Sequence, residues 1–104
     1  MVVYAKHAIG EVVRHSLYGY RGVIIDVDAE FSLSDNWYDK MATTRPDKSQ
    51  PWYQVLVNNS SIQTYVSEEL LEHDGSQADI QHPLIDVIFA GRQADTYQLL
   101  EKVN

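Results

Sequence analysis

The fold of this chain is decided by the stretch Ile9-Gly-Glu-Val-Val-Arg-His-Ser-Leu-Tyr-Gly-Tyr-Arg-Gly-Val-Ile-Ile-Asp-Val-Asp28. Its apolar and polar residues alternate on both sides of a glycine-containing turn, which is the pattern of two β-strands joined as a hairpin. Alternation in the second strand predicts a face toward the core with Val23, Ile25 and Val27. The opposite face is then expected to hold Tyr20, Gly22, Ile24, Asp26 and Asp28.

Two further strands are predicted at residues 52–57 and 62–66, because both segments are rich in aromatic and β-branched residues. Four polar residues separate them and form a hairpin loop. The connection over residues 31–51 is longer than compact domains usually tolerate without a use for it. We therefore predict a functional loop there, with Trp37 and Tyr38 as candidate protein-binding residues.

The C-terminal third is expected to contain a helical turn, a surface linker and a short helix. Ser67 is a plausible N-cap for a helical turn that ends at Leu71, and the polar residues 72–81 indicate a surface linker. A short helix is predicted at about residues 83–90, with Pro83 at its start, an apolar face of Leu84, Val87 and Ile88, and a C-cap at Gly91.

Together these elements predict a mainly β protein: a small, SH3-like, partly open β-barrel with short helical segments. A chain of 104 residues has the size of one ordinary domain. We expect a single domain over residues 1–104, with a core at about 8–71 and a C-terminal extension that carries the helix at 83–90.

The composition excludes several chemistries. With no cysteine, the chain has no thiol nucleophile, disulfide or thiolate metal site. The sequence contains neither a catalytic motif nor an established metal-ligand spacing. We interpret the acidic pair Asp26 and Asp28 as solvated surface, and likewise the polar segment from His73 to His82. We therefore predict no enzyme, no catalytic residue, no metal and no cofactor. Because no long apolar run is present, we expect a cytoplasmic protein without a membrane segment.

Positive charge is concentrated near the N-terminus of an otherwise acidic chain. The net charge is −7, although the residues through Arg21 carry +2. We single out Lys6, Arg14, His15 and Arg21 as candidate phosphate contacts and Tyr18 as a candidate stacking residue. Pairing of the arginines with nearby carboxylates is an equally weighted alternative. The overall negative charge opposes binding to DNA, which depends on the neutralisation of phosphates by cations.

Several segments in order resemble one known family. They are Ile9-Gly10, Val13-Arg14-His15, Tyr18-Gly-Tyr-Arg-Gly-Val-Ile24, Asp26-Val-Asp28, Pro51-Trp-Tyr53 and Thr64-Tyr-Val66 with Glu68. This combination resembles the HspQ or YccV-like hemimethylated-DNA-binding family from about residue 8 to 71, with a weaker likeness to about residue 97. The resemblance implies an SH3-like barrel, binding of hemimethylated DNA, and a stress-induced (heat-shock) role in protein quality control, promoting degradation by an ATP-dependent protease. It supplies no catalytic motif.

Two functions therefore stay open. The first is DNA binding through the N-terminal cations and Tyr18. The second is a protein-interaction barrel without DNA binding, in which a sheet edge or the loop with Trp37 and Tyr38 contacts an ATP-dependent protease or its clients. Unpaired strand edges are also compatible with a homo-oligomer.

Overall fold

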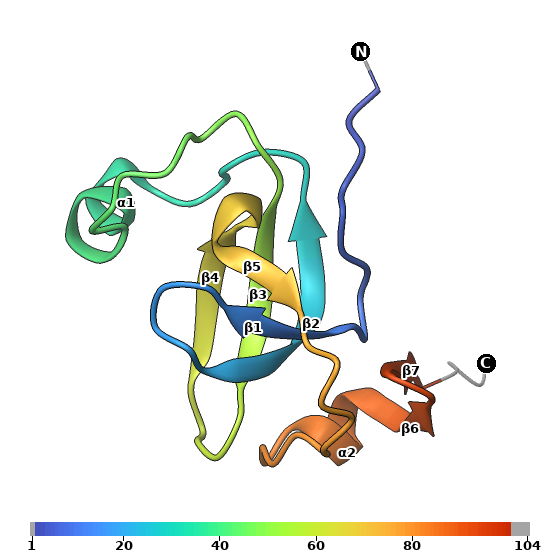
Figure 1. Cartoon of the computed structure of the whole chain (residues 1–104). Coiled ribbons are helices and arrows are strands. Elements are labelled where there is room, and N and C mark those ends of the chain that lie inside the picture. The colour runs from blue at the N-terminus through green and yellow to red at the C-terminus, as the bar shows by residue number, and fades with distance from the viewer. Residues whose placement is uncertain (1, 101–104) are drawn as a thin grey trace.

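The computed structural model describes residues 2–100 and shows a mainly β protein (Figure 1). A five-stranded antiparallel sheet has the order β4-β3-β2-β1-β5. Its strands are β1 (Val12–His15), β2 (Arg21–Asp28), β3 (Trp52–Val57), β4 (Gln63–Ser67) and β5 (Leu71–His73). A separate hairpin consists of β6 (Phe89–Gln93) and β7 (Thr96–Leu99). The helices are α1 (Asp35–Met41), the 3-10 turn η1 (Glu68–Leu70) and α2 (Ile85–Ile88).

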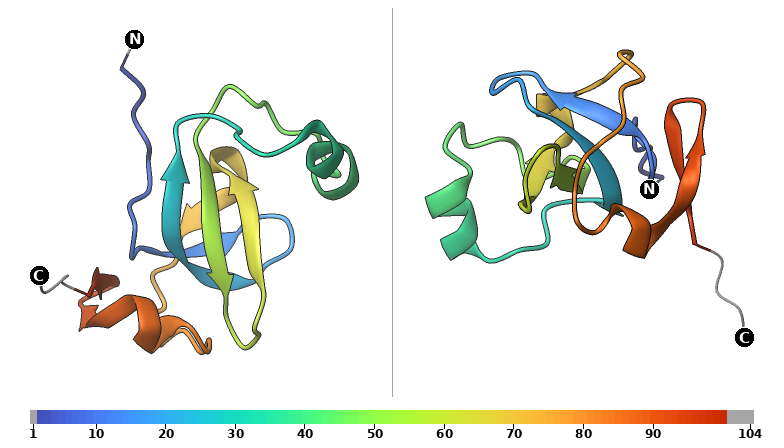
Figure 2. Two further views of the ribbon diagram at one scale, coloured as in Figure 1. Left: turned by 180° about the vertical axis from the view of Figure 1, so that it is seen from behind. Right: turned by 90° about the horizontal axis from the view of Figure 1, so that it is seen from below.

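The connection between β4 and β5 makes the sheet barrel-like. These strands follow each other in the chain, yet they lie at opposite edges of the sheet. The turn η1 carries the chain from one edge to the other, so the sheet curls until the edges approach, as Figure 2 shows. In the described chain β4 and β5 are not paired with each other, and the barrel stays open. The predicted SH3-like, partly open barrel is thereby confirmed.

The predicted alternation of β2 was wrong, because both faces of this strand contain buried residues. Ile24, which we expected on the outer face, is fully buried, whereas Ile25 is only partly buried. The faces are reassigned because the register shifts between Ile24 and Asp26, a bulge that breaks the period of two. Val23 packs in one core cluster and Ile24 in another, so both faces of this strand are covered.

The face of β2 that carries Val23 is covered by the C-terminal segment. The sequence did not predict this segment as a hairpin. Phe89 and Tyr97, on β6 and β7, pack with Val23 and with Ile80, which lies in the expected surface linker. The linker prediction was also wrong at its start, since β5 pairs there with β1. This hairpin and α1 lie at opposite ends of the sheet (Figures 1 and 2).

The helix predicted at 83–90 is shorter than expected, and different side chains face the core. It spans Ile85–Ile88, and Phe89 begins a strand. Ile85 and Ile88 pack against the core, whereas Leu84 and Val87, expected on the apolar face, are exposed. Gly91 lies inside β6 rather than at a C-cap, because the chain extends directly into the hairpin.

The long loop over residues 31–51 contains α1 and packs on the sheet. Ser34 caps the helix, with its hydroxyl accepting a hydrogen bond from the Trp37 amide at 3.1 Å. Tyr38 is buried beside Trp52 and Tyr65, which belong to β3 and β4. Aromatic packing on Trp52 and Tyr65 therefore holds this loop against the sheet and places it next to the N-terminal hairpin.

Candidate functional site

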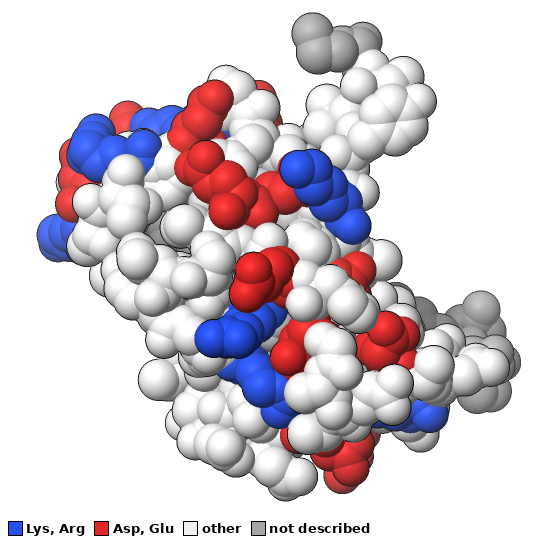
Figure 3. All heavy atoms as spheres, in the orientation of Figure 1, with Lys and Arg blue, Asp and Glu red and all other residues white. Residues whose placement is uncertain are grey.

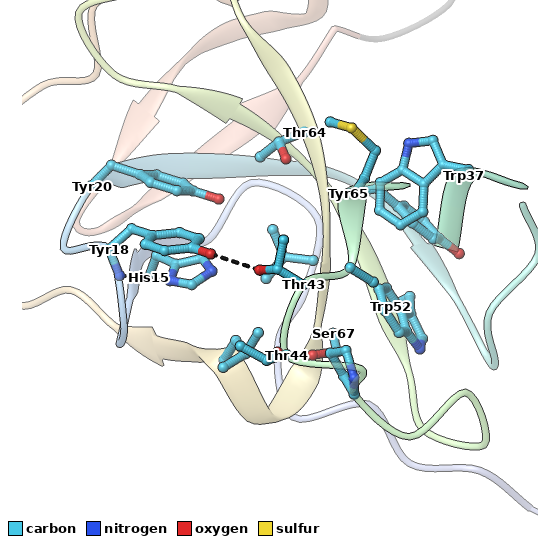
Figure 4. A pocket seen from close by; sticks show the side chains of 15 residues that line it. His15, Tyr18, Tyr20, Trp37, Thr43, Thr44, Trp52, Thr64, Tyr65 and Ser67 are labelled. Carbon is cyan, nitrogen blue, oxygen red and sulfur yellow. Dashed lines mark hydrogen bonds between the residues drawn. The ribbon is translucent and has the colours of Figure 1, made fainter. Parts of the chain in front are cut away.

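A pocket of about 210 Å³ lies between the β1–β2 turn and the long loop. Figure 4 shows two walls of rings that face each other across it. One wall comes from the N-terminal hairpin, and the other from α1, β3 and β4. The six rings are His15, Tyr18 and Tyr20 on the first wall and Trp37, Trp52 and Tyr65 on the second.

Each wall contains a stacked pair of rings. His15 and Tyr18 have centroids 4.6 Å apart with an angle of 19° between their planes. Trp52 and Tyr65 have centroids 5.3 Å apart with an angle of 23°. Because aromatic rings dominate both walls, the pocket is suited to an apolar group.

Hydrogen bonds fix both the orientation of the His15 ring and the ring nitrogen that carries its proton. Its side chain is buried, and its Nδ1 accepts hydrogen bonds from the Leu17 amide at 3.2 Å and the Tyr18 amide at 3.0 Å. An Nδ1 that accepts two hydrogen bonds carries no proton, so the neutral ring has its proton on Nε2. Burial lowers the pKa of His15, which favours this neutral form. His15 therefore contributes an oriented N–H group and no positive charge.

Ser67 differs from its predicted role. It occupies the N-cap position of η1, but its side chain makes no capping hydrogen bond. The amides of the turn are satisfied elsewhere: Glu68 donates to the Pro51 carbonyl at 2.9 Å and Glu69 to the Gln50 side chain at 3.0 Å. Ser67 is fully buried, and its hydroxyl has no hydrogen-bond partner within residues 2–100. Figure 4 shows this hydroxyl pointing into the pocket.

The remaining polar groups of the pocket are uncharged. Tyr18 and Thr43 approach each other, with their hydroxyl oxygens 3.0 Å apart, and join the hairpin to the loop. Burial raises the pKa of Tyr20 to about 12, a rise that the hydrogen bond to Thr64 partly offsets, so Tyr20 is neutral at physiological pH. No Lys, Arg, Asp or Glu lines the pocket within the described chain.

The predicted cationic patch is interrupted by carboxylates. Arg21 donates from Nε to Asp74 at 2.7 Å, and from Nη2 to the Ala78 carbonyl at 2.6 Å. Arg14 is exposed, and its neighbour across the β1–β5 pairing is Glu72. Lys6 is exposed, and its amide donates to Glu68 at 2.7 Å. Figure 3 shows basic and acidic groups interspersed on this face.

The ion pair between Arg21 and Asp74 is partly buried. Burial acts to raise the pKa of Asp74, but hydrogen bonds from Ser76 and Arg21, together with the Arg21 charge, outweigh it and lower the pKa. Asp74 is therefore ionised near neutral pH and compensates the charge of Arg21. Arg21 thus forms a structural ion pair. The sequence had left two alternatives for this arginine, a carboxylate pair or a phosphate contact.

The candidate residues of the two hypotheses meet at the pocket. His15 and Tyr18, predicted for DNA binding, line it together with Trp37, predicted for protein binding. Tyr38 is buried behind this surface, and its hydroxyl donates to the Pro46 carbonyl at 2.7 Å. No pattern in the sequence marked Ser67 as a pocket residue, because a serine before two glutamates is typical of a helix cap.

Among the described residues, potential metal ligands are not gathered at this pocket. Within residues 2–100 no three His, Asp or Glu side chains come together as potential ligands of a metal ion. The same residues include no helix that is both long and apolar enough to cross a membrane. The groups that the pocket offers to a ligand are aromatic rings, hydroxyls and one imidazole N–H.

The fold and this pocket define a class of protein: a small, open β-barrel with a ring-lined surface pocket. A comparison with protein families matches residues 5–96 to the YccV-like family, described as hemimethylated DNA-binding protein YccV like. The chain belongs to this family, which confirms the resemblance seen in the sequence. The family is described by DNA binding rather than by a catalytic activity.

Proposed function

We propose that this chain is a non-enzymatic cytoplasmic binding protein that recognises segments of client proteins and promotes their degradation by an ATP-dependent protease during stress. The observation that carries this proposal is the uncharged, ring-lined pocket between the N-terminal hairpin and the long loop. Apolar pockets with a few oriented polar groups are typical binding sites. Unfolded clients expose the apolar side chains that such a pocket accepts.

The electrostatics of the surface agree with a protein partner. The net charge of −7 repels DNA phosphates, and Arg21 is engaged by Asp74. A burial-depressed pKa keeps His15 neutral, so it does not attract a phosphate. An acidic surface carries no such penalty for binding a neutral or basic polypeptide segment.

A degradation assay tests this proposal. Purified cytoplasmic ATP-dependent proteases are incubated with unfolded client proteins, with and without this chain, and the loss of intact client is followed over time. We expect faster degradation of a subset of clients, and a Thr44→Arg variant, which places a charge in the pocket, to reduce that effect. Thr44 is exposed, so the variant is expected to fold. Client lifetimes unaffected by the wild-type chain would refute the proposal.

Hemimethylated-DNA binding is the second candidate, and the family description favours it. Arg14 and Tyr18 are both exposed on the N-terminal hairpin, where a phosphate and a base could reach them. Gel shifts with unmethylated, hemimethylated and fully methylated duplexes over a salt series test it. Replacing a residue that contacts a phosphate lowers the slope of log K against log salt by about one.

The arginines offer a matched pair for that experiment. Arg14→Ala is expected to lower the slope if the hairpin contacts DNA, whereas Arg21→Ala should change it less because Asp74 already holds the guanidinium. A chain that does not distinguish the three duplexes at low salt would rule out this second candidate.

A further inference from the structure

The pocket lies along the edge of the sheet that is formed by β4. Four consecutive residues of β4, from Thr64 to Ser67, line it. Successive side chains of a strand point to opposite faces, so a pocket on one face contacts only alternate residues. A pocket that contacts all four therefore lies beside the strand, along the edge that has no strand partner within the described residues.

The register of β4 shows which backbone groups are turned toward this edge. Val57 donates to the Ile62 carbonyl at 3.0 Å, which identifies a hydrogen-bonded pair. Such pairs alternate along antiparallel strands, so Thr64 and Val66 direct their backbone groups toward β3. The N–H and C=O groups of Tyr65 consequently face away from β3. Within residues 2–100, the β4 strand has β3 as its sole strand partner.

The interior of the pocket also contains one buried hydroxyl that has no hydrogen-bond partner in the described chain. The Ser67 hydroxyl is fully buried, points into the pocket and lacks a partner within the described residues. The His15 ring, whose Nδ1 accepts two amides, has its proton on Nε2. A buried polar group without a partner is unfavourable, so a ligand that hydrogen-bonds to Ser67 gains affinity from satisfying it.

We propose that an extended peptide segment of a client protein adds as a strand to the free edge of β4 and inserts a tyrosine side chain into the pocket. The stacked walls contact the two faces of the ring, and the phenol oxygen reaches the Ser67 hydroxyl. Backbone pairing supplies affinity, and the pocket supplies side-chain selectivity, as in other strand-addition complexes. This inference rests on the proposed function and specifies the ligand of the same site.

The choice of an uncharged ring follows from the walls of the pocket. A charged side chain would lose its hydration without gaining an ion pair, because no charged side chain lines the pocket within the described chain. Tyrosine combines an apolar body with a polar tip, which matches an aromatic lining that ends in a buried hydroxyl. Phenylalanine fills the same space but leaves Ser67 without a partner.

Direct peptide binding, without protease, tests this inference. The probes are terminally blocked hexapeptides of serine and threonine with tyrosine, phenylalanine, alanine or glutamate at one central position, titrated by calorimetry into the full chain. We expect tyrosine to bind about tenfold or more tightly than alanine and about fivefold more tightly than phenylalanine. Glutamate is expected to bind most weakly. Equal affinity for all four peptides would overturn the inference.

Ser67→Ala is the diagnostic variant, since it removes a hydroxyl that has no partner among residues 2–100 and leaves the walls in place. It should abolish the preference for tyrosine over phenylalanine and leave phenylalanine binding unchanged. Ser49→Ala, an exposed serine outside the pocket, is the matched control and should keep the preference. A preference that survives in Ser67→Ala would show that the phenol does not reach this hydroxyl.

N-methylated peptides test the strand addition. Methylation of amides that face β4 should weaken binding at least tenfold, whereas methylation of the alternate amides should have little effect. Equal effects in both registers would exclude a strand paired with β4. Displacement of the tyrosine peptide by a hemimethylated duplex would instead assign the pocket to DNA.

The outcomes for the inference and for the proposed function are distinguishable. Peptide binding with the expected selectivity but without an effect on degradation would refute the protease role and leave the ligand assignment intact. Accelerated degradation that neither Ser67→Ala nor the tyrosine peptide alters would support the protease role and refute the ligand assignment.

Discussion

The hydroxyl of Tyr18 lies 3.0 Å from the hydroxyl of Thr43, across 25 residues of chain. This contact joins the β1–β2 turn to the loop that carries α1, and both segments line the pocket. The two regions that the sequence suggested for different partners therefore form one site.

Tyr18→Phe is expected to loosen the loop while preserving the fold. Because this hydrogen bond is exposed, its loss should reduce the free energy of unfolding by no more than about 1 kcal/mol. Hydrogen exchange at the amides of residues 42–46 should become faster. Tyr4→Phe, at an exposed tyrosine outside the pocket, is the control and should leave exchange there unchanged. Identical exchange in both variants would show that the contact does not restrain the loop.

Two serine substitutions should differ in their effect on stability. Ser34→Ala removes the N-cap of α1 and should lower the free energy of unfolding by about 1 kcal/mol. Ser67→Ala removes a buried hydroxyl without a partner in the described chain, so stability should stay the same or increase. Urea denaturation of both variants measures the difference. A larger loss for Ser67→Ala would mean that its hydroxyl is hydrogen-bonded in the free protein.

The buried imidazole predicts a specific dependence on pH. Burial lowers the pKa of His15 below its usual 6.5, so below pH 6.5 the unfolded chain takes up this proton more readily than the folded one. The contribution of neutral His15 to stability is present above pH 6.5 and declines as the pH falls toward the folded pKa. Denaturation of wild type and His15→Gln at pH 5 to 8 should show a steeper decline in wild type. Parallel curves would contradict this assignment.

Asp74→Asn should be clearly destabilising because it leaves Arg21, whose side chain is only 19% exposed, without its counter-charge. The expected loss in the free energy of unfolding is about 1.5–3 kcal/mol. Asp39→Asn breaks a solvent-exposed pair with Arg45 and should change stability by less than about 1 kcal/mol. Thermal unfolding at neutral pH compares them. Similar melting temperatures for the two variants would argue against a structural role for the Arg21 pair.

Two glycines in the N-terminal hairpin should respond differently to alanine. A Cβ at Gly22 would lie 2.5 Å from a Val55 methyl carbon and 2.6 Å from the Leu56 carbonyl oxygen. Since backbone cannot yield easily, Gly22→Ala should destabilise by about 1–3 kcal/mol or more. Gly19 has a positive φ of 78° but open space around it, so Gly19→Ala should lose about 1 kcal/mol from backbone strain alone. Equilibrium denaturation ranks them, and a larger loss at Gly19 would contradict the packing around Gly22.

The chain order of hydrophobic and turn residues was enough to predict the hairpin of β1 and β2 and the pairing of β3 with β4. These predictions succeeded because alternation and turn residues act over a few neighbouring positions. The prediction failed for Ile24 because a bulge between Ile24 and Asp26 breaks the alternation. It missed β6 and β7 because the segment that covers the Val23 face of the sheet comes from residues 80–97. Short-range alternation carries no information about such a cover.

The sequence by itself determined the family, the β architecture and the absence of thiol chemistry, since these depend on residue types and local spacing. Only the tertiary structure decided which candidate residues act together. It paired Arg21 with Asp74, buried Tyr38, and assembled His15, Trp37 and Ser67 around one pocket. The physical reason is that these contacts join different segments of the chain, such as Arg21 and Asp74 at a separation of 53 positions, so curling of the sheet rather than local sequence sets the distance.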